Sequence, residues 1–317
     1  MNGLRACIIC LAVLLQGCDS PGKPLRIASL VWPGYETLYL ARSLDYFDAQ
    51  QVRMVELISA QEVSNALRSA KVDAAMITLD EALALMENGV DLRVVLVMDS
   101  SFGADVLMAR PDIQKLSQLK GKRIGLENAG NGALMLDAVL TKAALKPEDI
   151  RQVHLVLSEQ VDFYKNNTVD AIVSYEPASS ALKRAGARNL FDSREIPDRI
   201  LDVLVVRADA LAEHESELKA AIQGHFSALE YMAKSPADAA IRMAPRLAVD
   251  PGMVMQQFDG IKLPTVADNY RMLGGASPSL RESAQALTDL MVRQRLLRNA
   301  VDVSHLADAD FLPENMQ

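Results

Sequence analysis

Residues 26–47 read RIASLVWPGYETLYLARSLDYF, and this stretch decides the fold. Its first six residues form an apolar run of strand length, which ends at the turn Trp32-Pro33-Gly34-Tyr35. Leucine and alanine then recur at helical spacing between residues 38 and 44. This succession of strand, turn and helix predicts one unit of an open α/β sheet, in which ligands bind at the carboxyl ends of the strands.

The same unit recurs twice in the residues that follow. A strand predicted over residues 52–58 leads into Ser59-Ala60-Gln61-Glu62, and a strand over 74–77 leads into Thr78-Leu79-Asp80-Glu81. Both tetrapeptides match the capping box that opens a helix. The run LRVVLVM at residues 92–98 is almost wholly apolar, as expected for a strand that is covered on both faces. This alternation predicts a doubly wound sheet.

A second α/β block is predicted inside the first. The strand over residues 106–109 follows the strand over 92–98 with no helix between them, which indicates a crossing between two lobes. The second block then contains a helix over 132–144 and strands near 119–125, 153–157 and 170–174, before LDVLVVR at 201–207 returns. We expect a first lobe of residues 24–105 and 203–317 and an inserted second lobe of residues 106–202. Residues 208–297 are predicted to be helical, and the sequence shows no long repeat.

The first residues have the features of an exported lipoprotein. Residues 1–17 combine one positive charge with a short uncharged run, which is typical of a secretory signal and too short for a stable transmembrane helix. The ending Leu15-Gln16-Gly17-Cys18 resembles the bacterial lipobox, in which Cys18 would carry the lipid, although Gln16 departs from the usual pattern. Asp19 resembles the signal that retains enterobacterial lipoproteins on the inner membrane. We therefore expect a periplasmic protein that is lipid-anchored to the inner membrane.

Composition excludes several function classes. The formal net charge is −8, without basic runs, which is a poor match to nucleic acid. The four histidines are scattered and none lies in a metal-ligand spacing, so no metal and no cofactor are expected. No Gly-x-Ser-x-Gly elbow is present, and we predict no catalytic residues. Of three cysteines, Cys7 and Cys10 belong to the predicted leader, so no internal disulfide is expected.

Four stretches together resemble a known family, the periplasmic solute-binding proteins of the nitrate/sulfonate/taurine and thiamine-precursor group. They are residues 32–35, 72–81, 119–124 and 169–177. The resemblance implies a type II periplasmic-binding fold, with two lobes that are joined by a two-strand hinge and close over a small molecule. It also implies delivery to an ABC permease by a protein that we expect to be a monomer.

Two alternative functions stay open at this point. A receptor of the same construction could instead regulate an inner-membrane sensor. A remote alternative is an enzyme related to those that form a pyrimidine precursor, but the cysteine-rich motif of those enzymes is absent from residues 18–317.

The carboxyl ends of the predicted strands supply the candidate ligand-binding residues. Trp32, Tyr35 and Tyr175 are aromatic residues that we expect to contact a ligand from both lobes, although they could also cap a core. Ser59 and Thr78 could be helix caps only, and Asp105 could hold the hinge only. The complete set is Trp32, Tyr35, Ser59, Thr78, Asp80, Ser101, Asp105, Asn131, Tyr175 and Glu176.

The charge at these strand ends indicates the kind of ligand. Acidic residues gather at or near the predicted mouth, whereas Lys122 and Arg123 precede a strand and should lie at the opposite edge. An oxyanion would require arginine or free helix ends, while an amine or a nitrogenous heterocycle would gain from carboxylates and aromatic faces. The sequence therefore favours a cationic or heteroaromatic ligand.

Overall fold

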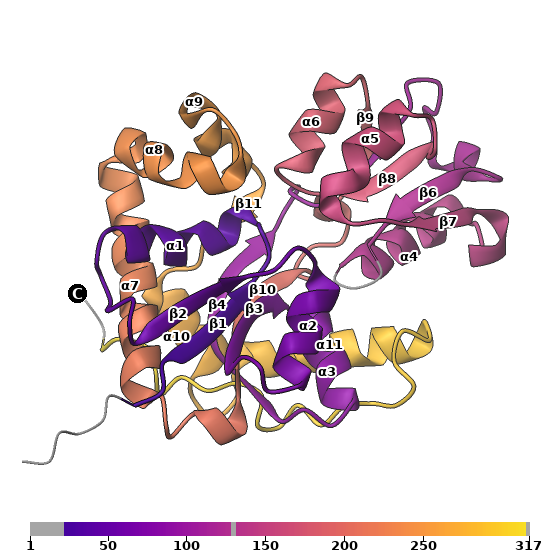
Figure 1. Ribbon diagram of the computed structural model, residues 1–317. Coiled ribbons are helices and arrows are strands. Elements are labelled where there is room, and N and C mark those ends of the chain that lie inside the picture. Colours follow the sequence, from indigo (N-terminus) through magenta and orange to yellow (C-terminus); the bar gives the residue numbers. More distant parts are fainter. Residues whose placement is uncertain (1–21, 128–130, 315–317) are drawn as a thin grey trace, which may run out of the picture.

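The computed structural model describes residues 22–127 and 131–314. In this part of the chain, strands form one six-stranded and one five-stranded sheet, each covered by helices (Figure 1). We call the larger sheet with its helices the first lobe and the smaller sheet with its helices the second lobe. The expected mixed α/β architecture is confirmed.

The sheet of the first lobe has the strand order β11-β4-β10-β3-β1-β2. Its strands are β1 (Leu25–Ser29), β2 (Val52–Glu56), β3 (Ala74–Thr78), β4 (Leu92–Ser101), β10 (Leu201–Arg207) and β11 (Ile261–Lys262). Its helices are α1 (Glu36–Ser43), α2 (Ala60–Arg68), α3 (Leu79–Glu87), α7 (Glu215–Lys234), α8 (Pro236–Leu247), α9 (Pro251–Val254), α10 (Val266–Leu273) and α11 (Ser279–Arg293). The apolar run in β4 is buried, as its composition predicts.

The sheet of the second lobe has the order β7-β6-β8-β5-β9. Its strands are β5 (Val106–Ala109), β6 (Arg123–Leu126), β7 (Arg151–His154), β8 (Ala171–Ser174) and β9 (Arg188–Asp192). Its helices are α4 (Gly132–Ala143), α5 (Gln160–Lys165) and α6 (Ala178–Arg184).

Two segments of the chain cross between the lobes. One leads from β4 to β5, and the other leads from β9 back to β10, which pairs antiparallel with both β3 and β4. Ser101 Oγ lies 2.7 Å from Ser193 Oγ, and this hydroxyl also accepts a hydrogen bond of 2.6 Å from Gly103 N. These bonds tie the two crossings together beside the site described below.

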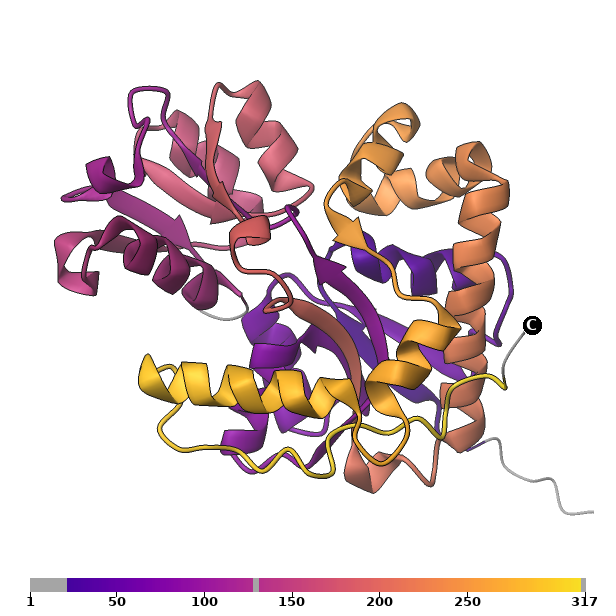
Figure 2. The same ribbon diagram turned by 180° about the vertical axis from the view of Figure 1, so that it is seen from behind.

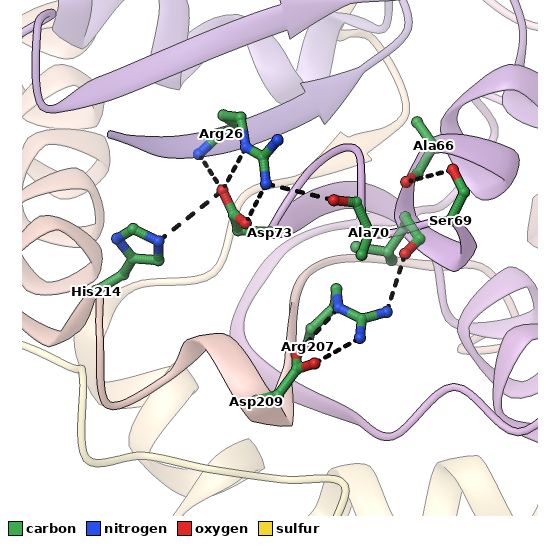
Figure 3. A network of polar contacts seen from close by, with 9 residues as sticks. Arg26, Ala66, Ser69, Ala70, Asp73, Arg207, Asp209 and His214 are labelled. Carbon is green, nitrogen blue, oxygen red and sulfur yellow. Dashed lines mark hydrogen bonds and ion pairs between the residues drawn. The ribbon is translucent and has the colours of Figure 1, made fainter. Parts of the chain in front are cut away.

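The lobes repeat one arrangement at the amino ends of their strands. In the first lobe Asp73 accepts hydrogen bonds from the backbone N and the guanidinium of Arg26, as Figure 3 shows. In the second lobe Asp170 accepts the same three bonds from Arg123, across the same separation of 47 residues. Both pairs join the start of a central strand to the residue before a neighbouring parallel strand. Although the sequence shows no long repeat, the two lobes therefore share this Arg–Asp arrangement.

One sequence prediction for the fold is corrected. The segment after residue 208 is not wholly helical, because Ile261 and Lys262 form β11 and pair antiparallel with Ser101 and Ser100. One apolar and one charged residue are too short a run to predict as a strand, but the open edge of β4 provides a partner. Figure 2 shows α11 running below the first lobe toward the second, where Gln294 donates a hydrogen bond to Asp137 of α4.

Candidate ligand-binding site

A small cavity lies between the lobes at the carboxyl ends of their strands. Its volume is about 30 Å³, room for only a few heavy atoms, whereas typical ligand pockets measure roughly 300 to 1,000 Å³. Both lobes and the first crossing contribute to its wall. The lining residues are Leu30, Trp32, Tyr35, Ala60, Thr78, Glu81, Asp105, Glu127, Asn131, Tyr175 and Asp202.

Two aromatic rings meet across the lobe boundary. The ring of Trp32, from the turn after β1, lies edge-on to the ring of Tyr175, which follows β8, with centroids 5.5 Å apart and planes at 80°. Such edge-to-face pairs stabilise a contact by roughly 0.5 to 1.5 kcal/mol beyond the area they bury. Both side chains are buried. The two lobes therefore touch through two residues that line the cavity.

The polar tips of the aromatic residues are all bonded to carboxyl groups. Trp32 Nε1 donates to Asp99 Oδ2 at 3.0 Å, Tyr175 Oη donates to Glu127 Oε2 at 2.6 Å, and Tyr35 Oη donates to Asp202. Buried indole and phenol groups require such acceptors. The aromatic residues are thereby held in fixed orientations around the cavity.

The turn between β1 and α1 depends on its glycine. A Cβ atom added to Gly34 would lie 1.8 Å from Asp99 Oδ2 and 2.6 Å from Trp32 Nε1. Only glycine allows the backbone to approach this bonded pair so closely. The Trp-Pro-Gly-Tyr turn is therefore built around the contact between Trp32 and Asp99.

Four carboxyl groups line the cavity: Glu81, Asp105, Glu127 and Asp202. Burial raises the pKa of Glu81 to about 8, an effect that the neighbouring Asp80 increases, and burial raises the pKa of Asp105 to about 6. Burial and the negative charge of Asp99 hold the pKa of Asp202 well above its usual range. Burial of charge without a counterion has this effect because the neutral acid is easier to desolvate.

Oxygen atoms of these acids lack partners in the described part of the chain. Glu81 Oε1 and Asp105 Oδ2 are buried and accept no hydrogen bond there. Buried polar atoms are nearly always paired, so unpaired carboxyl oxygens in one place indicate a missing donor. No lysine or arginine is among the described residues that line the cavity. The arrangement is suited to a ligand that donates hydrogen bonds or carries positive charge.

The positive charge of Arg246, an arginine beside the acidic cavity, is already compensated by neighbouring acids. Arg246 of α8 contacts Glu36, donates to Glu56 Oε2 at 2.7 Å and to the carbonyl of Leu30 at 2.8 Å, and lies over the ring of Tyr39 at 3.6 Å from its centroid. A guanidinium with this many partners has little capacity left for an anionic ligand. It lines a separate groove, described below, and not the cavity.

Six of the residues that the sequence suggested for ligand contact line the cavity. They are Trp32, Tyr35, Thr78, Asp105, Asn131 and Tyr175. Asn131 also donates a hydrogen bond to Asp105, which joins the second lobe to the first crossing. Thr78 Oγ1 donates to Glu81 Oε2 at 3.1 Å, within the predicted capping box of α3.

The other four lie outside the cavity for identifiable reasons. Ser59 caps α2 by accepting from Glu62 N, and Asp80 faces a cavity between α2, α3 and α11. Ser101 is engaged by Ser193 and by the backbone N of Asp105. Glu176 accepts bonds from Ser180 N and Oγ, at 3.2 and 2.8 Å, in the first turn of α6.

Sequence reasoning did not select Asp202, Glu127 or Glu81 as ligand contacts. Asp202 is the single acid in the apolar strand LDVLVVR, and an acid in such a run is itself a signal of a buried polar site. Glu81 was interpreted only as a capping partner and as part of the acidic mouth. Its second oxygen is the atom that capping leaves unused.

The predicted lipid-attachment residue, Cys18, and the neighbouring Asp19 lie outside the described residues.

None of the helices within residues 22–127 and 131–314 combines the length and the apolar character that crossing a membrane requires. The same ranges contain no cluster of His, Cys, Asp and Glu side chains with the geometry to hold a metal ion.

Comparison with solved structures identifies the fold. The alkanesulfonate-binding protein SsuA of Xanthomonas axonopodis pv. citri, bound to MOPS, matches with a TM-score of 0.74 at 19% identity, over 88% of this chain and 96% of that protein. The periplasmic aliphatic sulphonate-binding protein SsuA of Escherichia coli matches with 0.72 at 18%, over 90% and 97%. The desulfurization enzyme DSZB matches with 0.65 at 16%, over 92% and 97%. The predicted type II periplasmic-binding fold is confirmed.

Sequence comparison identifies the family. Curated relatives from Brucella abortus, Brucella suis and Brucella melitensis, each named as a binding protein, are 22% identical over 164 residues. The match covers 49% of this chain, and the chain spans about half the length of these relatives. The family model described as NMT1/THI5 like matches residues 32–239, which include the turn after β1 and the whole second lobe. The chain belongs to the NMT1/THI5-like family.

Proposed function

We propose that this protein is a periplasmic solute-binding protein that captures a small, cationic or heteroaromatic nitrogen compound between its lobes. One observation carries the proposal: four carboxyl groups and three aromatic residues, drawn from both lobes, converge on one cavity without a basic side chain among its described lining. A ligand that touches both lobes stabilises their contact, because it gains part of its interactions only when they meet.

A sulfonate or nitrate suits this cavity poorly. The structural neighbours include alkanesulfonate-binding proteins, but they are less than 25% identical to this chain. An anion would find no basic side chain among the described lining residues to balance its charge, and the partners of Arg246 already compensate that guanidinium. A protonated amine would instead supply donors to the unpaired carboxyl oxygens.

We propose further that the lobes, residues 24–105 with 203–317 and residues 106–202, move as units and deliver the solute to an ABC importer. Lipid attachment at Cys18 would hold a monomeric receptor beside an inner-membrane partner. Support comes from the family and from the fold. If uptake of the labelled ligand is unchanged in a deletion strain, the importer assignment fails and regulation of a membrane sensor replaces it.

Lipid attachment has its own test. Cys18→Ser should release the protein from membranes or block removal of the leader, because no other cysteine follows residue 17. Cell fractionation measures this. A substituted protein that still sediments with membranes like the original would rule out the lipid anchor.

The ligand class is tested with shape-matched pairs of opposite charge. A thermal-shift screen of small amines, nitrogen heterocycles, sulfonates and nitrate is followed by calorimetry on Glu81→Gln and Asp105→Asn. Each variant should weaken an amine by about tenfold to a hundredfold, as expected for loss of a charged hydrogen bond of roughly 1.5 to 3 kcal/mol. Glu176→Gln is the matched control, because that carboxylate is bonded to Ser180 outside the cavity.

The opposite result is equally clear. A sulfonate or nitrate that binds tightly, with an affinity indifferent to Glu81→Gln and Asp105→Asn, would overturn the proposed ligand class. The fold and the family would be unaffected by that outcome.

A further inference from the structure

A second, larger space lies next to the acidic cavity. This outer groove has a volume of about 420 Å³ and runs between the two lobes. The first lobe contributes the loops after β1 and β2 and the end of α8, while the second contributes α5 and the first turns of α6. Its wall is mainly apolar and includes Leu30, Ile58, Val161, Tyr175, Ala181 and Val249.

The outer groove and the acidic cavity share two wall residues, Leu30 and Tyr175. The hydroxyl of Tyr175 is bonded to Glu127, which lines the acidic cavity, while the chain continues directly into Pro177 and Ala178, which line the groove. The two spaces therefore meet at the same tyrosine.

The chemistry of the two spaces is opposite. The acidic cavity is small and lined by carboxyl groups, whereas the groove is large and apolar. The charged residues Glu56, Arg184 and Arg246 also line the groove, and Arg246 is compensated by Glu36 and Glu56. Ile58 keeps 73% of its surface exposed and adds apolar surface to the groove.

From this geometry we propose that the ligand is an amphiphilic amine, with its ammonium group in the acidic cavity and an apolar tail in the outer groove. The inference rests on the proposed function and adds the shape and polarity of the solute. A cavity of about 30 Å³ accepts little more than a head group, so the remaining atoms of a larger ligand need a second space, and the mainly apolar groove adjoins the cavity at Leu30 and Tyr175. Burial of the tail supplies affinity that so few head-group atoms do not.

A chain-length series tests the proposal. Calorimetry with straight-chain primary amines, from methylamine to octylamine below their micelle concentrations, should give an affinity gain of about fourfold per methylene once the chain enters the groove. Octane-1-sulfonate, with the same tail and the opposite charge, should bind at least tenfold more weakly than octylamine. These two results together support the head-and-tail arrangement.

Two substitutions locate the tail, and one serves as their control. Ile58→Asn makes the wall of the groove polar, and Ala181→Phe narrows it from the second lobe. Each should reduce the ratio of octylamine to methylamine affinity by about tenfold, which corresponds to two lost methylene contacts. Ile241→Asn is the matched control, because Ile241 is also a largely exposed isoleucine, at 59%, and lines neither space.

The outcomes separate this inference from the function on which it rests. If methylamine and octylamine bind equally well, the tail site is wrong and the proposed amine receptor stands. If no amine binds, or octane-1-sulfonate binds as tightly as octylamine, the proposed ligand class itself fails. A chain-length gain that Ile241→Asn reduces as much as Ile58→Asn does would place the tail outside the groove and overturn the inference.

Discussion

Glu36 and Glu81 occupy equivalent positions in two neighbouring units of the first lobe and have opposite surroundings. Each lies in the first turn of a helix that follows a parallel strand, α1 for Glu36 and α3 for Glu81, and each is buried. Burial raises the pKa of Glu36 to about 7 while Arg246 and Arg42 lower it. Burial raises the pKa of Glu81 to about 8, and Asp80 adds repulsion. Among its described residues, the protein provides a cation for Glu36 and none for Glu81.

The difference distinguishes a structural acid from a binding acid. Removing one partner from a buried ion pair is costly, because the remaining charge stays buried without compensation. A buried acid without a charged partner instead lowers the stability of the native protein, and a suitable ligand can relieve this destabilisation. The predictions below test this distinction, beginning with the largest expected effect.

Arg246→Met should destabilise the protein by about 3 to 5 kcal/mol at neutral pH, because it leaves Glu36 buried without its cation. Urea denaturation measures the free energy of unfolding. The double variant Glu36→Gln/Arg246→Met should recover part of the loss, since it leaves no uncompensated charge. A loss below about 1 kcal/mol in the single variant would mean that Glu36 needs no resident cation. The proposed difference between Glu36 and Glu81 would then be wrong.

Glu81→Gln should stabilise the protein at pH 8 and have little effect at pH 5. The folded pKa of about 8 exceeds the ordinary value of 4.5, so the stability that protonated Glu81 contributes is complete below pH 4.5 and lost as the pH rises through 8. The expected gain at pH 8 is up to about 4 kcal/mol. The glutamine oxygen can still accept from Thr78 N and so keeps the helix cap.

The control for this variant is Glu62→Gln. Glu62 accepts from Ile58 N at the start of α2, as Glu81 does at the start of α3, but its side chain is exposed. Its replacement should leave the free energy of unfolding unchanged between pH 5 and pH 8. If both variants behave alike, loss of the cap and not loss of a buried acid explains the effect.

Amine affinity should increase as the pH rises from 6 to 8. The raised pKa values of Asp105, about 6, and Glu81, about 8, mean that bound protons compete with the ammonium group in this range. Alkylamines stay protonated there, because their pKa lies near the value of about 10.4 for lysine. The expected change is up to about tenfold per pH unit, accompanied by proton release that calorimetry detects in buffers of different ionisation enthalpy. A flat profile would mean that neither acid binds the head group.

The smallest effect is expected at the opposite edge of the sheets. Burial raises the pKa of Asp73, but the hydrogen bonds from Arg26 outweigh it and hold the pKa below its ordinary value. The carboxylate therefore contributes stability above its unfolded pKa and loses it as the pH falls. Asp73→Asn should cost about 1 kcal/mol at pH 7, since Arg26 is 40% exposed, and nothing near pH 2. Thermal unfolding at the two pH values measures this, and a loss that persists in acid would assign the effect to packing.

Local sequence patterns were sufficient to predict the architecture. Strand and helix alternate with recognisable helix starts: the box at Thr78 forms as expected, and Ser59 caps α2 although the side chain of Glu62 accepts from Ile58 N instead. The aromatic residues at strand ends were also predictable, because the edge on which a residue lies follows from its position in the strand. Trp32 and Tyr175 reach the cavity for this reason.

What the sequence could not predict depends on pairing between distant segments. Asp202 reaches the cavity because β10 pairs with β3 and β4 in a register that sets Asp202 opposite Thr78 and Asp99. Glu176 follows Tyr175 directly, and successive residues face different directions, so both could not point into one cavity. Ser101 is occupied by Ser193, a residue 92 positions away.

The edge-on contact between Trp32 and Tyr175 also gives the molecule an optical property. Trp32 is the only tryptophan in the sequence, so fluorescence that is excited at wavelengths tyrosine does not absorb comes from this one ring. The ring lies where the two lobes touch. Emission from indole moves to longer wavelength when water reaches the ring. Separation of the lobes would expose a ring that is now 4% accessible and redden the emission, so the protein reports its own opening and closing without a chemical label.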